Sequence, residues 1–273
     1  MVRSVPLAAR LAAITIVAVT IVYMLAPLVV IIGAAFSAGG YLVFPPQGFS
    51  LEWFAKVFES EAYLRAGLLS LRVALVVTLI SVVIGTAAAI ALTRFRLPGR
   101  EVIQGLFLSP LIVPTIIFGI GMLVLFSRYG DGPSMAALVV GHVMITLPYV
   151  VRTVSAVLVG VDPATEEAAR VMGANAWQRY RYVLLPQCAA GIAAGAFFAF
   201  NISFDDAVVA IFLRGPDTET LPIKIYTEVE FTTDPSVAAA SALLILITVV
   251  MIVAVERLIG LKLLVARRVD RRG

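Results

Sequence analysis

Six stretches of this chain are apolar for long enough to cross a lipid bilayer, and this limits the possible folds more than any other feature. Of the 273 residues, 61% are apolar and only 14% are charged. A soluble domain carries roughly 25% charged residues, whereas a membrane-crossing helix needs about 20 apolar residues in a row. We therefore predict an all-α membrane protein with spans at residues 11–36, 67–93, 102–127, 134–158, 187–204 and 237–258.

The placement of Lys and Arg predicts the orientation, because basic residues gather on the cytoplasmic side of a membrane. With the N-terminus inside, an even number of spans makes both termini cytoplasmic, and 15 of the 21 basic residues fall on inner segments. The inner residues are Arg3, Arg10, Arg94, Arg96, Arg100, Arg152, Arg170, Arg179, Arg181, Arg257, Lys262, Arg267, Arg268, Arg271 and Arg272. The outer residues are Lys56, Arg65, Arg72, Arg128, Arg214 and Lys224.

Composition also bounds the chemistry. The one cysteine, Cys188, cannot form an internal disulfide, and the net charge of +4 is too dispersed to indicate nucleic-acid binding. A phosphate-binding P-loop needs Gly-Lys-Ser/Thr after a glycine-led loop. The three lysines, Lys56, Lys224 and Lys262, follow Ala, Ile and Leu. We therefore expect no nucleotide site, so that a separate subunit or an ion gradient supplies any energy.

Two features inside the spans have alternative interpretations. Pro110 and Pro114 interrupt the third run, where they form either two packed kinks or a flexible pore-lining helix. His142 lies in the fourth run, and a lone histidine there is more often hydrogen-bonded inside a helix bundle than a ligand or a proton relay.

Residues 162–186, between the fourth and fifth runs, carry the signals of two short helices. Asp162 can cap a helix that begins at Pro163, and Glu167 falls in its first turn, where the helix dipole favours negative charge. Gly173 can end this helix in a left-handed conformation, and Asn175 can cap a second helix. By these signals alone the segment is either an ordinary connecting hairpin or a surface for a cytoplasmic partner.

The spacing Glu167-Ala168-Ala169-(x3)-Gly173-(x9)-Val183-x-Leu185-Pro186 resembles the EAA signature of permeases in binding-protein-dependent ABC importers. That signature has Ile where this chain has Val183. The resemblance implies a coupling helix that docks on an ATPase subunit. It assigns this role to Glu167, Ala168, Ala169, Gly173 and Pro186.

The resemblance also implies the rest of the system. The fold would be that of a type I ABC importer permease, one domain over residues 1–273 in a bacterial inner membrane. The partners would be an ATPase dimer, a second homologous permease subunit and an extracytoplasmic substrate-binding protein. This chain would be no enzyme and would bind no metal or cofactor of its own, because ATP and Mg would bind to the ATPase.

The outer end of the fifth run holds Asn201, Asp205 and Asp206, which are either interfacial residues or part of a cation path. The segment 205–236, expected to be an outer loop, has seven acidic and two basic residues, a net charge of −5. An acidic segment at the outer entrance would concentrate cations. An excess of acidic residues is also common in outer loops, because basic residues are biased towards the cytoplasmic side.

A second resemblance concerns the solute. Phe204-Asp205-Asp206-x-Val208-Val209-x-x-Phe212-x-x-Gly215-Pro216 and Leu221-Pro222-x-Lys224-Ile225-Tyr226 are similar to the polyamine branch of these permeases, in its second permease subunit. This implies spermidine, putrescine or a related small cation. Another small solute, such as an opine or a phosphonate, is the alternative within the family.

Two other classes of protein remain as alternatives. A secondary transporter driven by an ion gradient would need inverted repeats and paired carboxylates near mid-membrane, and the sequence places no acidic residue deep in any span. A membrane enzyme or sensor would have only His142 as a candidate catalytic group.

Overall fold

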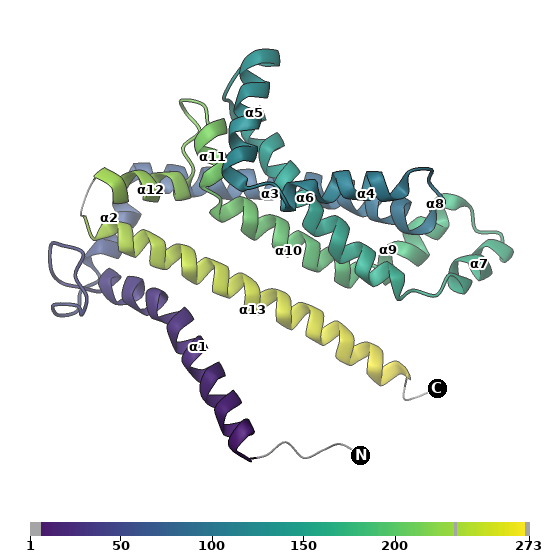
Figure 1. Ribbon diagram of the computed structural model, residues 1–273, viewed down its shortest axis with the longest axis horizontal. Coiled ribbons are helices and arrows are strands. Elements are labelled where there is room, and N and C mark those ends of the chain that lie inside the picture. Colours follow the sequence, from purple (N-terminus) through teal and green to yellow (C-terminus); the bar gives the residue numbers. More distant parts are fainter. Residues whose placement is uncertain (1–6, 232–233, 271–273) are drawn as a thin grey trace. The chain divides into compact units, whose positions relative to one another are not determined.

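The computed structural model describes residues 7–231 and 234–270, with side chains as far as residue 257. Within these ranges the chain is helical, and the one β-type pairing is an isolated bridge between Ser37 and Phe49 (Figure 1). The predicted all-α fold is therefore confirmed. Arg3, Arg271 and Arg272, which enter the orientation argument, lie outside the described residues.

The helices follow one another with short connections. They are α1 (Leu7–Ala35), α2 (Glu52–Glu59), α3 (Glu61–Arg94), α4 (Arg100–Leu108), the 3-10 turn η1 (Ser109–Leu111), α5 (Thr115–Tyr129), α6 (Met135–Val159), α7 (Ala164–Val171), α8 (Ala176–Arg179), the π-helical turn η2 (Tyr180–Leu184), α9 (Leu185–Gln187), α10 (Ala189–Asp205), α11 (Val208–Leu213), α12 (Leu221–Phe231) and α13 (Ser236–Asp270).

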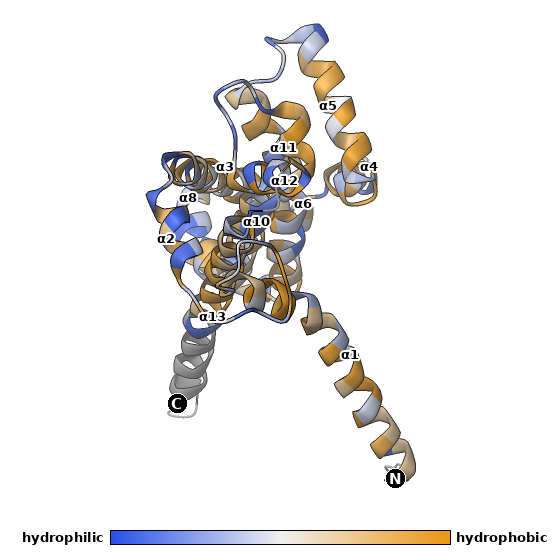
Figure 2. Ribbon diagram, turned by 90° about the vertical axis from the view of Figure 1, so that its left-hand side faces the viewer, coloured by the Kyte–Doolittle hydropathy of each residue, from blue (hydrophilic) through white to orange (hydrophobic). Residues whose placement is uncertain are grey.

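Four helices are long and apolar enough to cross a membrane unbroken: α1, α3, α6 and the Ser236–Arg257 part of α13. Two further candidates are bent pairs, one made of α4, η1 and α5 and the other of α8 to α10. Taken as one span each, they give six candidates in the order that the sequence predicts. Figure 2 shows α1 as mostly hydrophobic along its length, as expected of a helix that faces lipid.

The third candidate span is not the continuous helix that the apolar run 102–127 suggests. Its two halves meet at 104°. Pro114 is the cause, because it has no N–H to continue the hydrogen-bond ladder of α4 and η1, and its backbone is extended at ψ 129°. This break is sharper than the packed kinks that were one of the two alternatives for Pro110 and Pro114.

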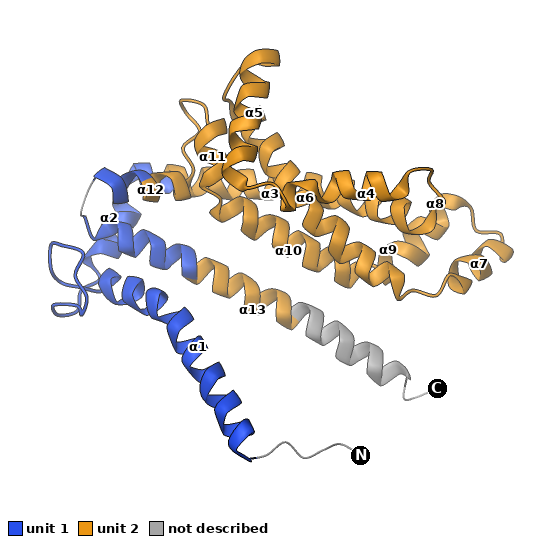
Figure 3. Ribbon diagram, viewed as in Figure 1, with its two compact units in different colours: residues 1–64, 227–245 blue, residues 65–226, 246–273 orange. Residues whose placement is uncertain are grey.

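The chain divides into two compact units, coloured separately in Figure 3. Unit 1 comprises residues 1–64 and 227–245, and unit 2 comprises residues 65–226 and 246–273. The prediction of one permease domain over residues 1–273 stays a prediction.

Unit 1 contains the short helix α2. Just before it, the Ser50 hydroxyl accepts a hydrogen bond from the Glu52 N–H at 3.1 Å. The indole of Trp53 donates to the Ser37 carbonyl at 2.9 Å, and the Lys56 ammonium lies 2.5 Å from the Asp234 carboxylate. These contacts hold α2 against the segments before and after it in this unit.

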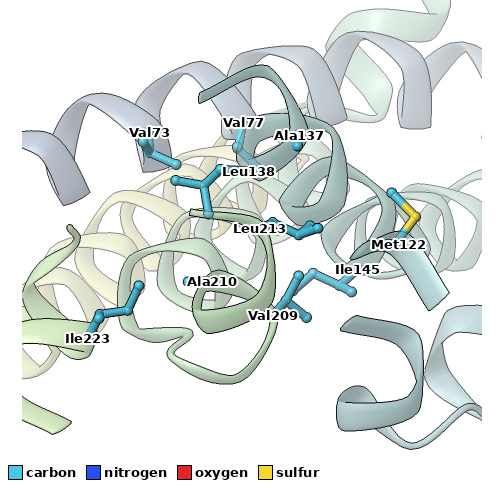
Figure 4. Close-up of a cluster of buried hydrophobic side chains, with 10 residues drawn as sticks. All are labelled: Val73, Val77, Met122, Ala137, Leu138, Ile145, Val209, Ala210, Leu213 and Ile223. Carbon is cyan, nitrogen blue, oxygen red and sulfur yellow. The ribbon is translucent and has the colours of Figure 1, made fainter. Parts of the chain in front are cut away.

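The main core of unit 2 forms where α11 packs against α5 and α6 (Figure 4). Val209 and Leu213 of α11 are fully buried against Leu138 of α6 and Val77 of α3. The contact is close because residue 141 is glycine. A Cβ atom on Gly141 would lie only 2.2 Å from Cδ1 of Leu213.

The segment 205–236 is therefore not the simple outer loop that was predicted. It contains α11, in which Val209, Ala210 and Leu213 are buried, and α12. Several of its carboxylates have partners: Glu228 accepts from the Tyr63 hydroxyl, Asp234 pairs with Lys56, and Asp206 caps α11. Counting charges could not reveal this, because the apolar run Val208–Leu213 lies between acidic residues.

Candidate functional site

The segment between α6 and α10 that was predicted to be cytoplasmic, residues 162–186, begins with two short helices, α7 and α8, which are joined at Gly173. Asp162 accepts a hydrogen bond from the Ala164 N–H at 2.9 Å, and the Thr165 hydroxyl donates to its carbonyl at 2.8 Å. Asp162 therefore stabilises the start of α7 as predicted, although the helix begins at Ala164, one residue later than expected. Pro163 precedes the first helical residue.

Gly173 ends α7 in a left-handed conformation, with φ at +90°. Its N–H donates to the Arg170 carbonyl, and the Ala174 N–H donates to the Ala169 carbonyl, both at 3.0 Å. This pair of bonds is a Schellman C-cap, which satisfies two carbonyls that the helix leaves unpaired. A side chain at position 173 would be strained in this conformation, which agrees with the glycine that the sequence places there.

The second helix begins with a reciprocal cap. The Asn175 side chain accepts from the Gln178 N–H at 2.9 Å, and the Gln178 side chain accepts from the Asn175 N–H at 2.8 Å. The helix then becomes the wider π-helical turn η2. This turn lies shortly before Pro186, which has no backbone N–H to donate. Pro186 lies inside α9, and the 71° bend that leads into α10 comes after Gln187.

The predicted coupling residues lie on a largely exposed surface. Glu167, Ala168 and Gly173 are exposed, Ala169 is half-buried, and Pro186 is exposed in α9. Bulky apolar side chains surround the turn and are also exposed. Val171 is 88% exposed, Met172 86% and Trp177 63%. We call Glu167, Val171, Met172 and Trp177 the elbow patch. Exposed apolar groups rimmed by charge are typical of a protein-contact surface.

An ion pair that was not predicted ties this segment to the end of α3. Nε of Arg94 lies 2.7 Å from Oε1 of Glu166, and both side chains are less than a fifth exposed. Nη2 of Arg94 also donates to the Val161 carbonyl at 3.0 Å. The sequence shows three arginines after the second apolar run, Arg94, Arg96 and Arg100, but it does not indicate that Glu166 pairs with one of them.

At the other end of α10, Asp206 has a structural role. Its Oδ2 accepts from the N–H groups of Val209 and Ala210, at 2.9 and 3.1 Å, and so caps α11. The same oxygen lies 3.6 Å from Nε2 of His142. Asp206 thus fixes α11 against α6, and it has little freedom to bind a passing solute.

His142 is completely buried and lies in a polar network within unit 2. Its Nδ1 is 2.9 Å from the Ser203 hydroxyl, which agrees with the expectation of a histidine hydrogen-bonded inside the bundle. One turn along α6, the Thr146 hydroxyl lies 2.8 Å from that of Ser81. The network joins α3, α6, α10 and α11, and only the His142 part could be suspected from the sequence.

Asn201 and Asp205 lie one turn apart on α10, which puts them on one face of the helix. Asp205 is exposed, and Asn201 is half-buried. The amide nitrogen of Asn201 donates a hydrogen bond to the Phe197 carbonyl at 2.9 Å. Phe198 is 42% exposed, and its ring lies 6.0 Å from that of Tyr149. A carboxylate, an amide oxygen and aromatic rings are groups that attract an organic cation.

The three candidate residues for the substrate path, Asn201, Asp205 and Asp206, therefore differ in their accessibility to a solute. Asn201 and Asp205 share an accessible face, whereas Asp206 turns towards α11 and His142. Within residues 7–231 and 234–257, no three His, Cys, Asp or Glu side chains are grouped so that they could hold a metal ion.

Comparison with known proteins identifies the family. Residues 81–261 match the family described as the binding-protein-dependent transport system inner membrane component. The spermidine/putrescine transport system permease protein PotC of Escherichia coli K12 is 32% identical over 232 residues, which cover 85% of this chain and 88% of PotC. The putrescine transport system permease protein PotI of the same strain is 29% identical and covers 82% of each chain.

A solved structure has the same fold. The crystal structure of a bacterial alginate ABC transporter in complex with an alginate pentasaccharide-bound periplasmic protein includes a chain that aligns with a TM-score of 0.71. The alignment covers 90% of this chain and 93% of that one, at 17% identity. The fold is thus that of an ABC importer permease, and the chain belongs to the family of inner membrane components of binding-protein-dependent transport systems.

Proposed function

We propose that this chain is the permease subunit of an ATP-driven importer that moves spermidine, putrescine or a related small cation across the inner membrane. The observation that carries the substrate class is the 32% identity to the permease PotC over 85% of this chain. The resemblance of the segments around Asp205 and Lys224 to polyamine permeases supports the same class.

The accessible face of α10 gives this proposal a physical basis. Asp205 supplies a carboxylate for an ammonium group, Asn201 supplies an amide oxygen, and Phe198 supplies an aromatic face. A polyamine carries several ammonium groups separated by methylene chains, so it suits a surface that alternates charge and aromatic rings. In this mechanism Asp205 and Asn201 contact the cation, whereas Asp206 positions α11.

The coupling role belongs to Glu167, Ala168, Ala169, Gly173 and Pro186. The exposed elbow patch supports this role, because exposed Val171 and Met172 gain from burial against a partner. Glu167 adds a charged contact, and the small Ala168 and Ala169 allow close approach. The bonded Gly173 cap keeps α7 and α8 at a fixed angle, as transmission of a motion requires.

The remaining subunits complete the system. We propose an ATPase dimer beneath the membrane, a second homologous permease beside this chain and an extracytoplasmic binding protein. ATP and Mg would bind to the ATPase, and no cofactor is assigned to this chain. Both termini and residues 162–186 would be cytoplasmic, which the bias of basic residues towards the inner segments supports.

The test is ATP hydrolysis by the complex purified with its partner subunits and reconstituted in lipid nanodiscs. The binding protein is loaded in turn with spermidine, putrescine or an unrelated small solute. We expect hydrolysis to rise only with a polyamine-loaded binding protein. Stimulation by another solute alone would keep the importer and replace the substrate class. Uptake into proteoliposomes driven by an ion gradient without ATP would instead establish a secondary transporter.

A further inference from the structure

A groove between α4 and α6 in unit 2 is not used by the proposed transport site. At the end nearest α7 it forms a pocket of about 240 Å³. Arg100 and Gln104 of α4, Arg152 and Ser155 of α6 and Thr93 of α3 supply its polar groups. No carboxylate lines this pocket, so its charge is positive.

Farther along the same helices lies a second pocket, of about 330 Å³, with a different character. Its lining is almost wholly apolar and includes Leu106 and Phe107 of α4, Phe118 of α5, and Met144 and Leu147 of α6. Ser109, Pro110 and Val113, which lie at the bend between α4 and α5, also line it.

The two pockets follow one another along α6. The lining residues of the apolar pocket end at Leu147, and those of the basic pocket begin one turn later at Val151. From Val143 to Val159 the lined part of α6 measures about 24 Å, at 1.5 Å per residue. The two pockets share no lining residue, but they follow one another along α6 over a length that suits a phospholipid, with its headgroup at the basic pocket and an acyl chain at the apolar pocket.

Charge decides which lipid would fit. Among the described residues, neither the Arg100 nor the Arg152 guanidinium has an ion pair, and both residues are exposed. Basic pockets between membrane helices on the cytoplasmic side attract anionic headgroups. The same two charges repel a polyamine, which separates this groove from the proposed solute path.

We propose that the groove between α4 and α6 binds an anionic phospholipid, with its phosphate on Arg100 and Arg152 and an acyl chain against Phe118, Met144 and Leu147. Its headgroup would lie at the inner leaflet in the proposed orientation. The bound lipid would hold the two halves of the broken third span at a fixed angle against α6.

Lipid retention by the purified transport complex tests this directly. Native mass spectrometry would follow the release of phosphatidylglycerol and phosphatidylethanolamine during titration with detergent. We expect selective retention of phosphatidylglycerol. Affinity should fall about fivefold for Arg100→Gln or Arg152→Gln and about 30-fold for both, given the usual contribution of one basic side chain near an anionic lipid. Arg96→Gln, an exposed arginine outside the pocket, is the matched control.

A second pair of variants distinguishes a lipid from free phosphate. Met144→Trp fills the apolar pocket and should displace the lipid, whereas Val140→Trp, one turn away and outside the lining, should not. The proposal is overturned if the double arginine variant retains phosphatidylglycerol as Arg96→Gln does, or if inorganic phosphate displaces the lipid and Met144→Trp has no effect. Efficient cross-linking of Gln104→Cys to the second permease would also overturn it, because a protein surface would then occupy the groove.

Discussion

Asp205 and Asp206 are adjacent in the sequence, yet their surroundings give them different roles. Asp205 is exposed on the face that also carries Asn201. Asp206 accepts two backbone hydrogen bonds from α11 and lies 3.6 Å from His142. A dipeptide motif cannot assign these roles, because α10 ends at Asp205 and the backbone of Asp206 is extended, with ψ at 119°.

Neutralising each aspartate should therefore have different effects. Asp205→Asn should raise the KM for uptake about tenfold, because it removes a charged partner of the cation, and should leave thermal unfolding unchanged. Asp206→Ala should lower the free energy of unfolding by about 1–2 kcal/mol through loss of the α11 cap. Uptake kinetics and thermal unfolding of the purified complex measure both. Equal effects of the two variants on unfolding would contradict this division.

Gly141 provides a second test at this scale, since the missing side chain leaves room for Leu213. Gly141→Ala should cost about 1–3 kcal/mol of stability, as expected for overpacking of a core. Adding Leu213→Ala should remove the clash, so the two substitutions together should cost less than the sum of each alone. Gly121→Ala, at an open position on α5, is the control and should be neutral. Strict additivity would show that the contact does not limit packing.

At the scale of helices, the sequence predicts a large part of the arrangement. The six apolar runs correspond to the candidate spans, and the caps at Asp162, Gly173 and Asn175 lie where local rules place them. These features depend on neighbours in sequence. The burial of α11 required tertiary information, because it depends on α5 and α6. Pro114 marks where the third span breaks, but the local sequence does not give the 104° angle between the two halves.

The Arg94–Glu166 ion pair joins α3 to α7 and is partly buried, so each charge depends on the other. Arg94→Glu alone places two carboxylates together and should reduce ATP-driven uptake severalfold. The exchanged pair Arg94→Glu with Glu166→Arg should recover much of the loss. Transport assays of the three proteins at equal membrane levels measure this. Failure of the exchange to recover any activity would indicate that the residues act separately.

On the exposed side of α7, Glu167→Arg should uncouple the motor. Because Glu167 is exposed, the substitution should not alter folding, and it reverses a contact proposed for the ATPase. Hydrolysis should continue while uptake falls at least tenfold. Glu101→Arg reverses an exposed charge on α4 and serves as the control. Normal uptake by Glu167→Arg would remove this residue from the coupling surface.

At the scale of a whole unit, ion pairs join elements that are far apart in the sequence. In unit 1 the Asp234 carboxylate, which pairs with Lys56 of α2, is an example. Burial raises its pKa, but the Lys56 ammonium and the Ser236 N–H outweigh that effect, so the pKa lies below its ordinary value of 3.8. A lowered pKa stabilises the folded state above about pH 4, and this contribution is lost as the pH falls through the folded pKa.

Asp234→Asn should therefore reduce stability at neutral pH by under about 1 kcal/mol, because the pair is partly exposed. The difference from the unmodified protein should disappear in strong acid, where Asp234 is protonated in both states. Thermal unfolding of the reconstituted chain at pH 7 and at progressively lower pH measures it. Glu59→Gln, at an exposed position of α2, should show no such dependence.

The orientation of the whole chain can be checked with single cysteines, since Cys188 is the one natural cysteine and is buried. In a Cys188→Ser background, Ala174→Cys should react with a membrane-impermeant maleimide only in inside-out vesicles. Leu42→Cys should react only in right-side-out cells. The reverse pattern would invert the proposed topology.

The elbow patch also has a consequence for how the subunits are produced. Val171 and Met172 are nearly as exposed as in an unfolded chain, at 88% and 86%. Left uncovered, these side chains stay in water, where they favour self-association. If the proposed ATPase subunit covers the patch, synthesis of this permease should stay in step with synthesis of that subunit, and an unmatched surplus should cluster in the membrane.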